Sequence, residues 1–185
     1  LMVSSLMVPV SAQDEVEKKE SVYTVLNTDG SIKSITVSDN LHSDGGFKDY
    51  QDKSNLNDVV NLKSNDPVVS NSNGYVWNSD EKDIYYQGTS KEELPLTFKI
   101  TYKLDGSEYK AEDLLGKSGH LTISIKVNNS SKQTYNVKGK TYNLATPFVT
   151  GLTAMFDEDS FKNVTVDNGT VTSDSSHSVV VGAMV

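Results

Sequence analysis

The chain has 185 residues, contains no cysteine and carries a formal net charge of −8 at pH 7. A disulfide framework, a thiolate metal site and a cysteine nucleophile are therefore excluded. All 17 basic residues are lysine. Since arginine is the preferred residue for bidentate contacts with phosphates and base edges, we expect no nucleic-acid partner for this acidic chain.

The first twelve residues have the pattern of the end of an export signal. An apolar run of ten residues is followed by Ser11-Ala12 and then by a charged segment. Small residues at the −3 and −1 positions, Val10 and Ala12, form a cleavage signature, so residues 1–12 are predicted to be a signal-peptide remnant. Two alternatives are a buried strand and the end of a longer membrane helix, because a full span needs roughly 20 apolar residues. Export without cysteine fits a bacterial envelope.

The next part of the chain is predicted to be a charged linker, 13–20, followed by a β-rich subdomain, 21–88. The dipeptide Asp29-Gly30 lies between two apolar runs, 22–26 and 32–37, as expected for a tight hairpin. Residues 38–74 are rich in Asn, Asp, Ser and Gly. They are interpreted as a long polar loop of this subdomain, and a small subdomain formed together with 21–37 is the alternative.

The second half, 89–185, is predicted to be a β-sandwich domain. Apolar and polar residues alternate strictly over 94–104 and again over 121–128, which is typical of strands with one buried face. Turn signals follow at Asp105-Gly106, Lys138-Gly139 and Asn168-Gly169. The fold class is therefore all-β, an antiparallel β-sandwich for which an immunoglobulin-like layout is one arrangement. Short helical turns are expected at 110–115 and 157–162, and a single domain over 21–185 is the alternative division.

Four aromatic residues lie close together in the sequence and allow two interpretations. Exposed, they would form a platform for sugar rings, as in a carbohydrate-binding module. Buried, they would be core residues whose rings pack across two paired strands. The four residues, which are the candidate ligand-binding residues, are Tyr75, Trp77, Tyr85 and Tyr86.

Acidic residues provide a candidate cation site and no specific catalytic pair. Asp157, Glu158 and Asp159 supply the hard oxygens that Ca²⁺ prefers, although their spacing matches no twelve-residue calcium loop. The three histidines are far apart and lack metal-ligand spacing. We expect no cofactor and no enzyme activity. An envelope hydrolase with an acid pair assembled from separate strands is kept as an alternative.

Several segments together resemble a known family. They are similar to the extracytoplasmic N-terminal region of Gram-positive membrane proteins of the phage-infection-protein (Pip/YhgE-like) group. The resemblance covers 20–185 and includes no catalytic signature. The segments that carry it are Val-Tyr-Thr-Val-Leu-Asn-Thr-Asp-Gly-Ser at 22–31, Lys-Asp-Ile-Tyr-Tyr-Gln-Gly-Thr at 82–89, Glu-Leu-Pro at 93–95, Phe-Lys-Ile-Thr-Tyr-Lys-Leu-Asp-Gly at 98–106, Asp-Leu-Leu-Gly-Lys-Ser-Gly at 113–119 and Val-Val-Val-Gly at 179–182.

The resemblance implies a β-rich segment on the outer side of the membrane, with membrane helices in flanking sequence. The chain ends within an apolar strand pattern, 178–185, so the parent protein is expected to continue. The predicted function is non-catalytic: binding or structural scaffolding at the envelope, with an envelope protein or a cell-wall component as partner. Contact with the membrane is expected only through the flanking segments, and nothing in the sequence indicates an oligomeric state.

Overall fold

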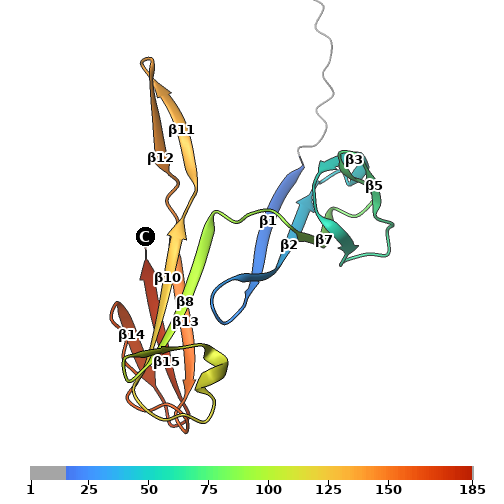
Figure 1. Ribbon diagram of the computed structural model, residues 1–185. Helices are drawn as coiled ribbons and strands as arrows, with labels where there is room; N and C mark the ends of the chain where they lie inside the picture. Colours follow the sequence, from blue (N-terminus) through green and yellow to red (C-terminus); the bar gives the residue numbers. More distant parts are fainter. Residues whose placement is uncertain (1–15, 185) are drawn as a thin grey trace, which may run out of the picture. The chain divides into compact units, whose positions relative to one another are not determined.

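The computed structural model describes residues 16–184 and consists of antiparallel strands joined by turns, with one short 3₁₀ helix (Figure 1). The prediction of an all-β antiparallel fold is confirmed. The helix, η1, spans Ala111–Leu114 and lies within the segment predicted to turn. The strands are β1 (Glu17–Leu26), β2 (Ile32–His42), β3 (Phe47–Lys53), β4 (Asn57–Asn61), β5 (Val69–Asn71), β6 (Gly74–Ser79), β7 (Asp83–Ser90), β8 (Leu96–Leu104), β9 (Ser107–Tyr109), β10 (Leu121–Asn129), β11 (Lys132–Val137), β12 (Lys140–Ala145), β13 (Thr150–Asp157), β14 (Gly169–Ser173) and β15 (His177–Met184).

The chain divides into two compact units. The first holds the described residues up to Leu94 together with Phe98–Lys126, and the second holds Pro95–Thr97 and the residues from Val127 onward. This division differs from a boundary at 88/89, because most of β8 is tied to the β1–β2 turn. The Ile100 amide donates to the Asp29 carbonyl at 2.9 Å, and the Tyr102 hydroxyl donates to the Thr28 carbonyl at 2.9 Å. Alternation locates a strand but does not specify its partners.

Two sheets of the first unit pack face to face around its core. One has the strand order β1-β2-β7-β4 and the other β3-β6-β5. The inward residues of β2 and β7 alternate with outward ones, as a half-buried sheet requires. The buried cluster takes Leu41, Ile84 and Tyr86 from the first sheet and Phe47, Tyr75 and Trp77 from the second. The two sheets form a small β-sandwich, and β8, β9 and β10 form a separate three-stranded sheet in the order β10-β8-β9.

The centre of this core is aromatic. Trp77 stacks on Tyr86 with ring centroids 5.0 Å apart, and Tyr75 lies 6.5 Å from Trp77 and 6.3 Å from Tyr86. Stacked and tilted aromatic pairs at such separations add to the free energy of burial. The chain has no disulfide, so the unit depends on packing for its stability. The buried apolar residues that supply this packing are those of the cluster.

Two parts of the predicted domain plan are wrong. Residues 17–20, assigned to a charged linker, form the start of β1 and pair with the end of β2. Residues 38–74, assigned to a long polar loop, contain β3, β4 and β5. In both segments the backbone pairs with neighbouring strands while most polar side chains stay at least partly exposed, with Asp39, Ser43 and Asp52 as the buried exceptions, so polarity alone was a misleading loop signal. The predicted remnant at 1–12 and residues 13–15 of the linker lie outside the described residues.

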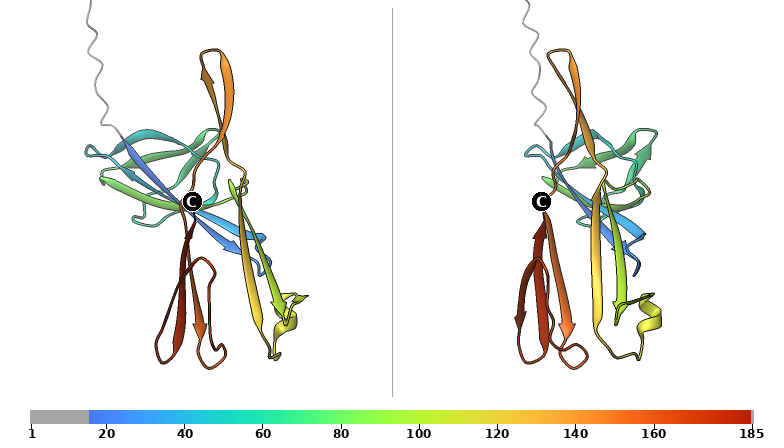
Figure 2. Two further views of the ribbon diagram at one scale, coloured as in Figure 1. Left: turned by 90° about the vertical axis from the view of Figure 1, so that its left-hand side faces the viewer. Right: turned by 60° about the vertical axis from the view of Figure 1, so that its left-hand side comes forward.

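The second unit contains the sheet β13-β15-β14 and the hairpin β11–β12 (Figure 2). The Lys138-Gly139 turn joins the hairpin, as its sequence predicts. The predicted helical turn at 157–162 is instead a hydrogen-bonded loop, in which the Asp157 carbonyl accepts from the amides of Ser160 and Phe161. The apolar pair Val164 and Val166 lies outside any strand.

Gly74 begins β6 at a place where a side chain does not fit. Its φ is +127°, and an added Cβ would collide with the Asp52 carbonyl oxygen and the Ser54 nitrogen. Gly106 also has a positive φ, +83°, but an added Cβ there meets open space. We expect Gly74→Ala to destabilise the first unit by more than about 2 kcal/mol and Gly106→Ala by about 1 kcal/mol. Urea unfolding of both variants tests this difference, and equal losses would contradict it.

Candidate functional site

A cluster of charged groups lies inside the first unit, beside the aromatic core. Lys18 Nζ lies 2.9 Å from Asp52 Oδ1 and 3.2 Å from Asp39 Oδ2. It also donates to the Tyr86 hydroxyl at 3.1 Å, and that hydroxyl donates to Asp52 Oδ2. The side chains of Asp39 and Asp52 are 1% and 4% exposed, whereas that of Lys18 is 29% exposed. One cation therefore faces two buried carboxylates.

Strand register brings these four residues together. On β2, Asp39 follows Ile35 and Val37 at inward positions and lies opposite Tyr86 of β7. On β1, Lys18 lies opposite Leu41, another inward residue. Asp52 comes from β3 of the facing sheet. The cluster therefore connects the edge strand of one sheet, β1, to the edge strand of the other, β3.

The electrostatics of the cluster favour a proton on Lys18 and on Tyr86. Burial opposes the charged lysine, but its hydrogen bond to Asp52 and the charges of Asp52 and Asp39 outweigh burial and raise the pKa of Lys18. Burial, and next the two neighbouring carboxylates, raises the pKa of the Tyr86 hydroxyl far above its usual range. Within the described residues, Asp39 has the Lys18 ammonium as an ion-pair partner at 3.2 Å but no well-oriented hydrogen bond to either oxygen. A buried carboxylate with so few partners is costly.

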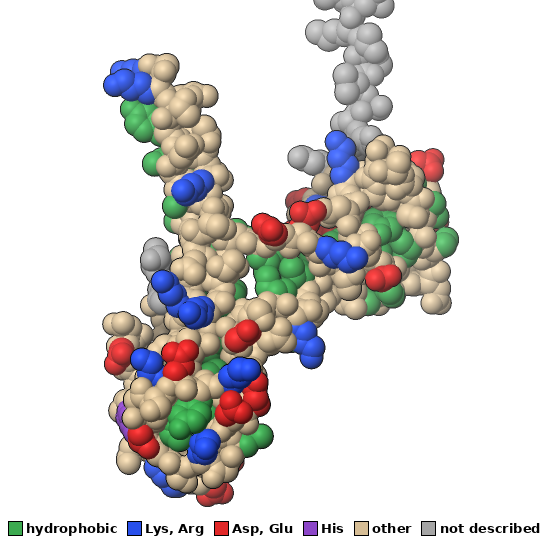
Figure 3. All heavy atoms as spheres, viewed as in Figure 1, with side chains coloured by type: hydrophobic (Ala, Val, Ile, Leu, Met, Phe, Trp, Pro, Cys, Tyr) green, Lys and Arg blue, Asp and Glu red, His purple; other side chains and the backbone are tan. Residues whose placement is uncertain are grey.

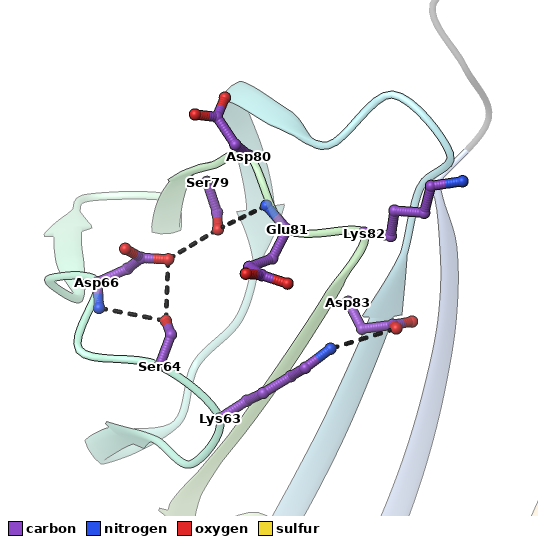
Figure 4. Close-up of a pocket in the computed structure, with 8 residues that line it drawn as sticks. All are labelled: Lys63, Ser64, Asp66, Ser79, Asp80, Glu81, Lys82 and Asp83. Atoms are coloured by element: carbon purple, nitrogen blue, oxygen red, sulfur yellow. Dashed lines mark hydrogen bonds and ion pairs between the residues drawn. The ribbon is translucent and has the colours of Figure 1, made fainter.

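A second feature is an open polar hollow of about 500 Å³ at the end of β6 and the start of β7 (Figure 4). Its centre is Asp66, whose Oδ2 accepts from the hydroxyls of Ser64 at 2.9 Å and Ser79 at 2.7 Å. At its edge, Lys63 Nζ pairs with Asp83 Oδ2 at 3.3 Å. Figure 4 shows Asp80 and Lys82 pointing away from this hydrogen-bonded group. Most of the polar side chains that line the hollow already bind a neighbour on the protein, an arrangement that anchors the loop between β4 and β5.

The Asp66 carboxyl is expected to titrate below its ordinary range. The hydrogen bonds from Ser79 and then from Ser64 stabilise the carboxylate and lower the pKa of Asp66. A lowered pKa in the folded state contributes stability above the unfolded value, and that contribution is lost as the pH falls through the folded value. We expect Ser79→Ala to raise the pKa of Asp66, measured by NMR titration of its carboxyl. Ser72→Ala, at an exposed serine, is the control, and equal titration curves in all three proteins would contradict the assignment.

The predicted aromatic platform is wrong for three of its four residues. Trp77 is 1% exposed, Tyr86 is fully buried and Tyr75 is 8% exposed, so these rings belong to the core. Tyr85 alone is exposed, because it alternates with Tyr86 on β7. The Trp77-based sugar site loses its stacking surface, and the alternative interpretation, rings packed between paired strands, describes the structure.

The predicted cation site is also not assembled. Asp157 Oδ1 accepts the amide of Asp159 at 2.7 Å, and Glu158 accepts the Ser178 hydroxyl. These carboxylates therefore cap a turn and bind a neighbouring strand. Within residues 16–184, no three His, Asp or Glu side chains converge as metal ligands.

The β11–β12 hairpin presents an exposed apolar face. Tyr135 lies opposite Tyr142 in the register. Val137 follows Tyr135 by two positions on β11, and Leu144 follows Tyr142 by two positions on β12, so all four side chains lie on the same face of the hairpin. All four side chains are exposed. In Figure 3, hydrophobic and lysine side chains are visible on this hairpin at the upper left.

Comparison with known proteins adds no relative: no family model, no curated protein and no solved structure matches the chain. Of the residues that the structure describes, none form a helix long and apolar enough to cross a membrane.

Sequence reasoning missed the Lys18, Asp39 and Asp52 cluster, although one signal pointed to it. Asp39 occupies the third position of the alternation Ile-x-Val-x-Asp-x-Leu at 35–41. A charged residue in an inward series predicts a buried carboxylate that needs a cation. No comparable signal identifies Lys18, which lies in a run of charged residues, or Asp52, which lies in a polar segment.

Proposed function

We propose that this chain is a non-catalytic, extracytoplasmic module of a Gram-positive membrane or cell-surface protein, acting in structural scaffolding and binding at the envelope. The observation that carries the scaffolding role is that the charged cluster and the aromatic residues lie between the two sheets of the first unit. Lys18, Asp39 and Asp52 connect its two sheets, and Trp77 and Tyr86 fill the space between them. These groups rigidify the unit and are turned away from solvent ligands.

The placement outside the cytoplasm is supported by sequence features. The apolar run with small residues at its end is a signal-peptide pattern, and the absence of cysteine fits a bacterial envelope. The resemblance to the phage-infection-protein (Pip/YhgE-like) group supports a parent protein that is attached to the membrane. The exposed apolar face of the β11–β12 hairpin supports the binding role, with an envelope protein or a cell-wall component as partner.

Surface labelling of cells tests this proposal. A short epitope is inserted between Lys138 and Gly139, in the exposed turn of the hairpin, within the complete gene in its native host. We expect an antibody to label intact cells, with a cytoplasmic protein carrying the same epitope labelled only after permeabilisation. Labelling of the module only after permeabilisation would overturn the extracytoplasmic assignment.

A further inference from the structure

We propose that Lys18 and Asp52 become joined by an intramolecular amide bond, with Asp39 as the proton relay, which covalently links strands β1 and β3. This inference goes beyond the proposed function and is independent of where the protein works. It rests on four contacts inside the first unit: Lys18 with Asp52, Lys18 with Asp39, Lys18 with Tyr86, and Tyr86 with Asp52.

The reacting groups are held together by the fold. Lys18 Nζ lies 2.9 Å from Asp52 Oδ1, and the two residues are 34 positions apart in the sequence. Holding an amine and a carboxyl in contact converts a reaction between two molecules into a step within one molecule, with effective concentrations that reach about 10⁵–10⁸ M in well-oriented systems. Tyr86, a core residue, accepts a hydrogen bond from Lys18 and donates one to Asp52, which holds the two side chains on the same side of the core.

Asp52 and Asp39 differ in their distance to Lys18 and in their contact with Tyr86, and this difference assigns Asp52 as the reacting carboxyl and Asp39 as the proton relay. Asp52 is the nearer one, and its Oδ2 accepts a hydrogen bond from the Tyr86 hydroxyl. That donor stabilises negative charge on Oδ2 when the carbonyl is attacked. Asp39 lies 3.2 Å from Lys18 Nζ and, within the described residues, accepts no hydrogen bond. A carboxylate beside the amine with free lone pairs is suited to accept and return a proton.

The step balances without a co-reactant. The ammonium–carboxylate pair is the favoured resting state, and the reaction starts from the minor neutral pair: a proton passes from the Lys18 ammonium to the Asp52 carboxylate, which transiently leaves an amine and a carboxylic acid. The amine nitrogen attacks Asp52 Cγ and forms the new C–N bond, and Asp39 takes a proton from that nitrogen. Asp39 returns the proton to the departing Oδ1 hydroxyl, the C–O bond breaks, and water leaves. The ammonium and the carboxylate become an amide and one water, and the Asp39 carboxylate is restored.

The surroundings favour the amide over the ion pair. A buried ion pair carries the cost of removing two charges from water, whereas an amide is neutral. The cluster holds one cation and two anions, so amide formation leaves a single charge, that of Asp39, in place of three. Lys18 remains 29% exposed, so a path for the released water exists. The product fixes the edge strand of each sheet to the other.

Intact-mass measurement of the denatured full chain is the first test. We expect a mass lower than the sequence mass by one water. Three Asp-Gly pairs, at Asp29, Asp44 and Asp105, can also lose water by forming cyclic imides, so the linkage must be located. Trypsin does not cleave after an acylated lysine. We therefore expect the peptide that ends at Lys19 to be joined to the peptide 49–53. A full sequence mass with a free 49–53 peptide overturns the proposal.

Three variants separate the cross-link from an ordinary ion pair. Lys18→Arg keeps the positive charge, and we expect this variant to lose no water through a link between residues 18 and 52. Asp52→Asn is expected to cross-link with loss of ammonia in place of water, a mass change that no ion pair produces. Asp39→Asn is expected to slow cross-linking by at least about 100-fold, with folding checked by circular dichroism. Wild-type cross-linking in a folded Asp39→Asn chain would overturn the relay role. Surface labelling is unaffected by these outcomes, so the two proposals fail separately.

Discussion

Replacing Trp77 with alanine is expected to lower the free energy of unfolding of the first unit by about 3–5 kcal/mol. Trp77 is 1% exposed, and its ring stacks on Tyr86 at 5.0 Å. Its removal deletes contacts to both sheets and leaves a cavity that the surrounding strands cannot fill by small shifts. Urea unfolding followed by circular dichroism measures the loss.

Tyr85→Ala is the matched control for this prediction. Tyr85 is adjacent to Tyr86 on β7 but faces outward and is 42% exposed. We expect its removal to change the free energy of unfolding by less than about 1 kcal/mol. If Tyr85→Ala destabilised the chain as much as Trp77→Ala, the assigned inward and outward faces of β7 would be wrong. Since Trp77 is the single tryptophan, its emission also reports burial directly, and iodide should quench it little in the native protein.

Replacing Lys18 with methionine is expected to cost about 3–5 kcal/mol at neutral pH. Methionine has a similar volume but removes the nitrogen that Asp39 and Asp52 face at 3.2 and 2.9 Å, and with it both the ion pair and the proposed amide. Two buried carboxylates then remain without a positive partner, which is more costly than the loss of the pair itself. Thermal unfolding of the variant and the parent at neutral pH measures the effect.

The neighbouring lysine supplies the control. Lys19 follows Lys18 on β1, is exposed and by strand alternation points to the opposite face of the sheet, so Lys19→Met is expected to change stability by less than about 0.5 kcal/mol. A Lys18→Met chain as stable as Lys19→Met would show that the cluster does not hold the sheets together.

The strands and turns could largely be predicted from local patterns. Asp29-Gly30, Asp105-Gly106 and Lys138-Gly139 join paired strands as expected, and strict alternation located β8 and β10. These features depend on the backbone conformations that Gly allows and on the two-residue repeat of a strand, both of which are local. Failures occurred where polar strands resemble loops, as in β3 to β5.

The sequence by itself determined the composition of this protein: an acidic, cysteine-free, strand-rich chain whose core must depend on packing. Only the tertiary structure decided which residues share an environment. The aromatic residues Tyr75, Trp77, Tyr85 and Tyr86 allowed both an exposed platform and a core, and the facing sheets bury three of the four. Lys18, Asp39 and Asp52 belong to three strands, and only the pairing register and the packing of two sheets bring them within hydrogen-bond distance. Such contacts depend on long-range register, which local sequence patterns do not specify.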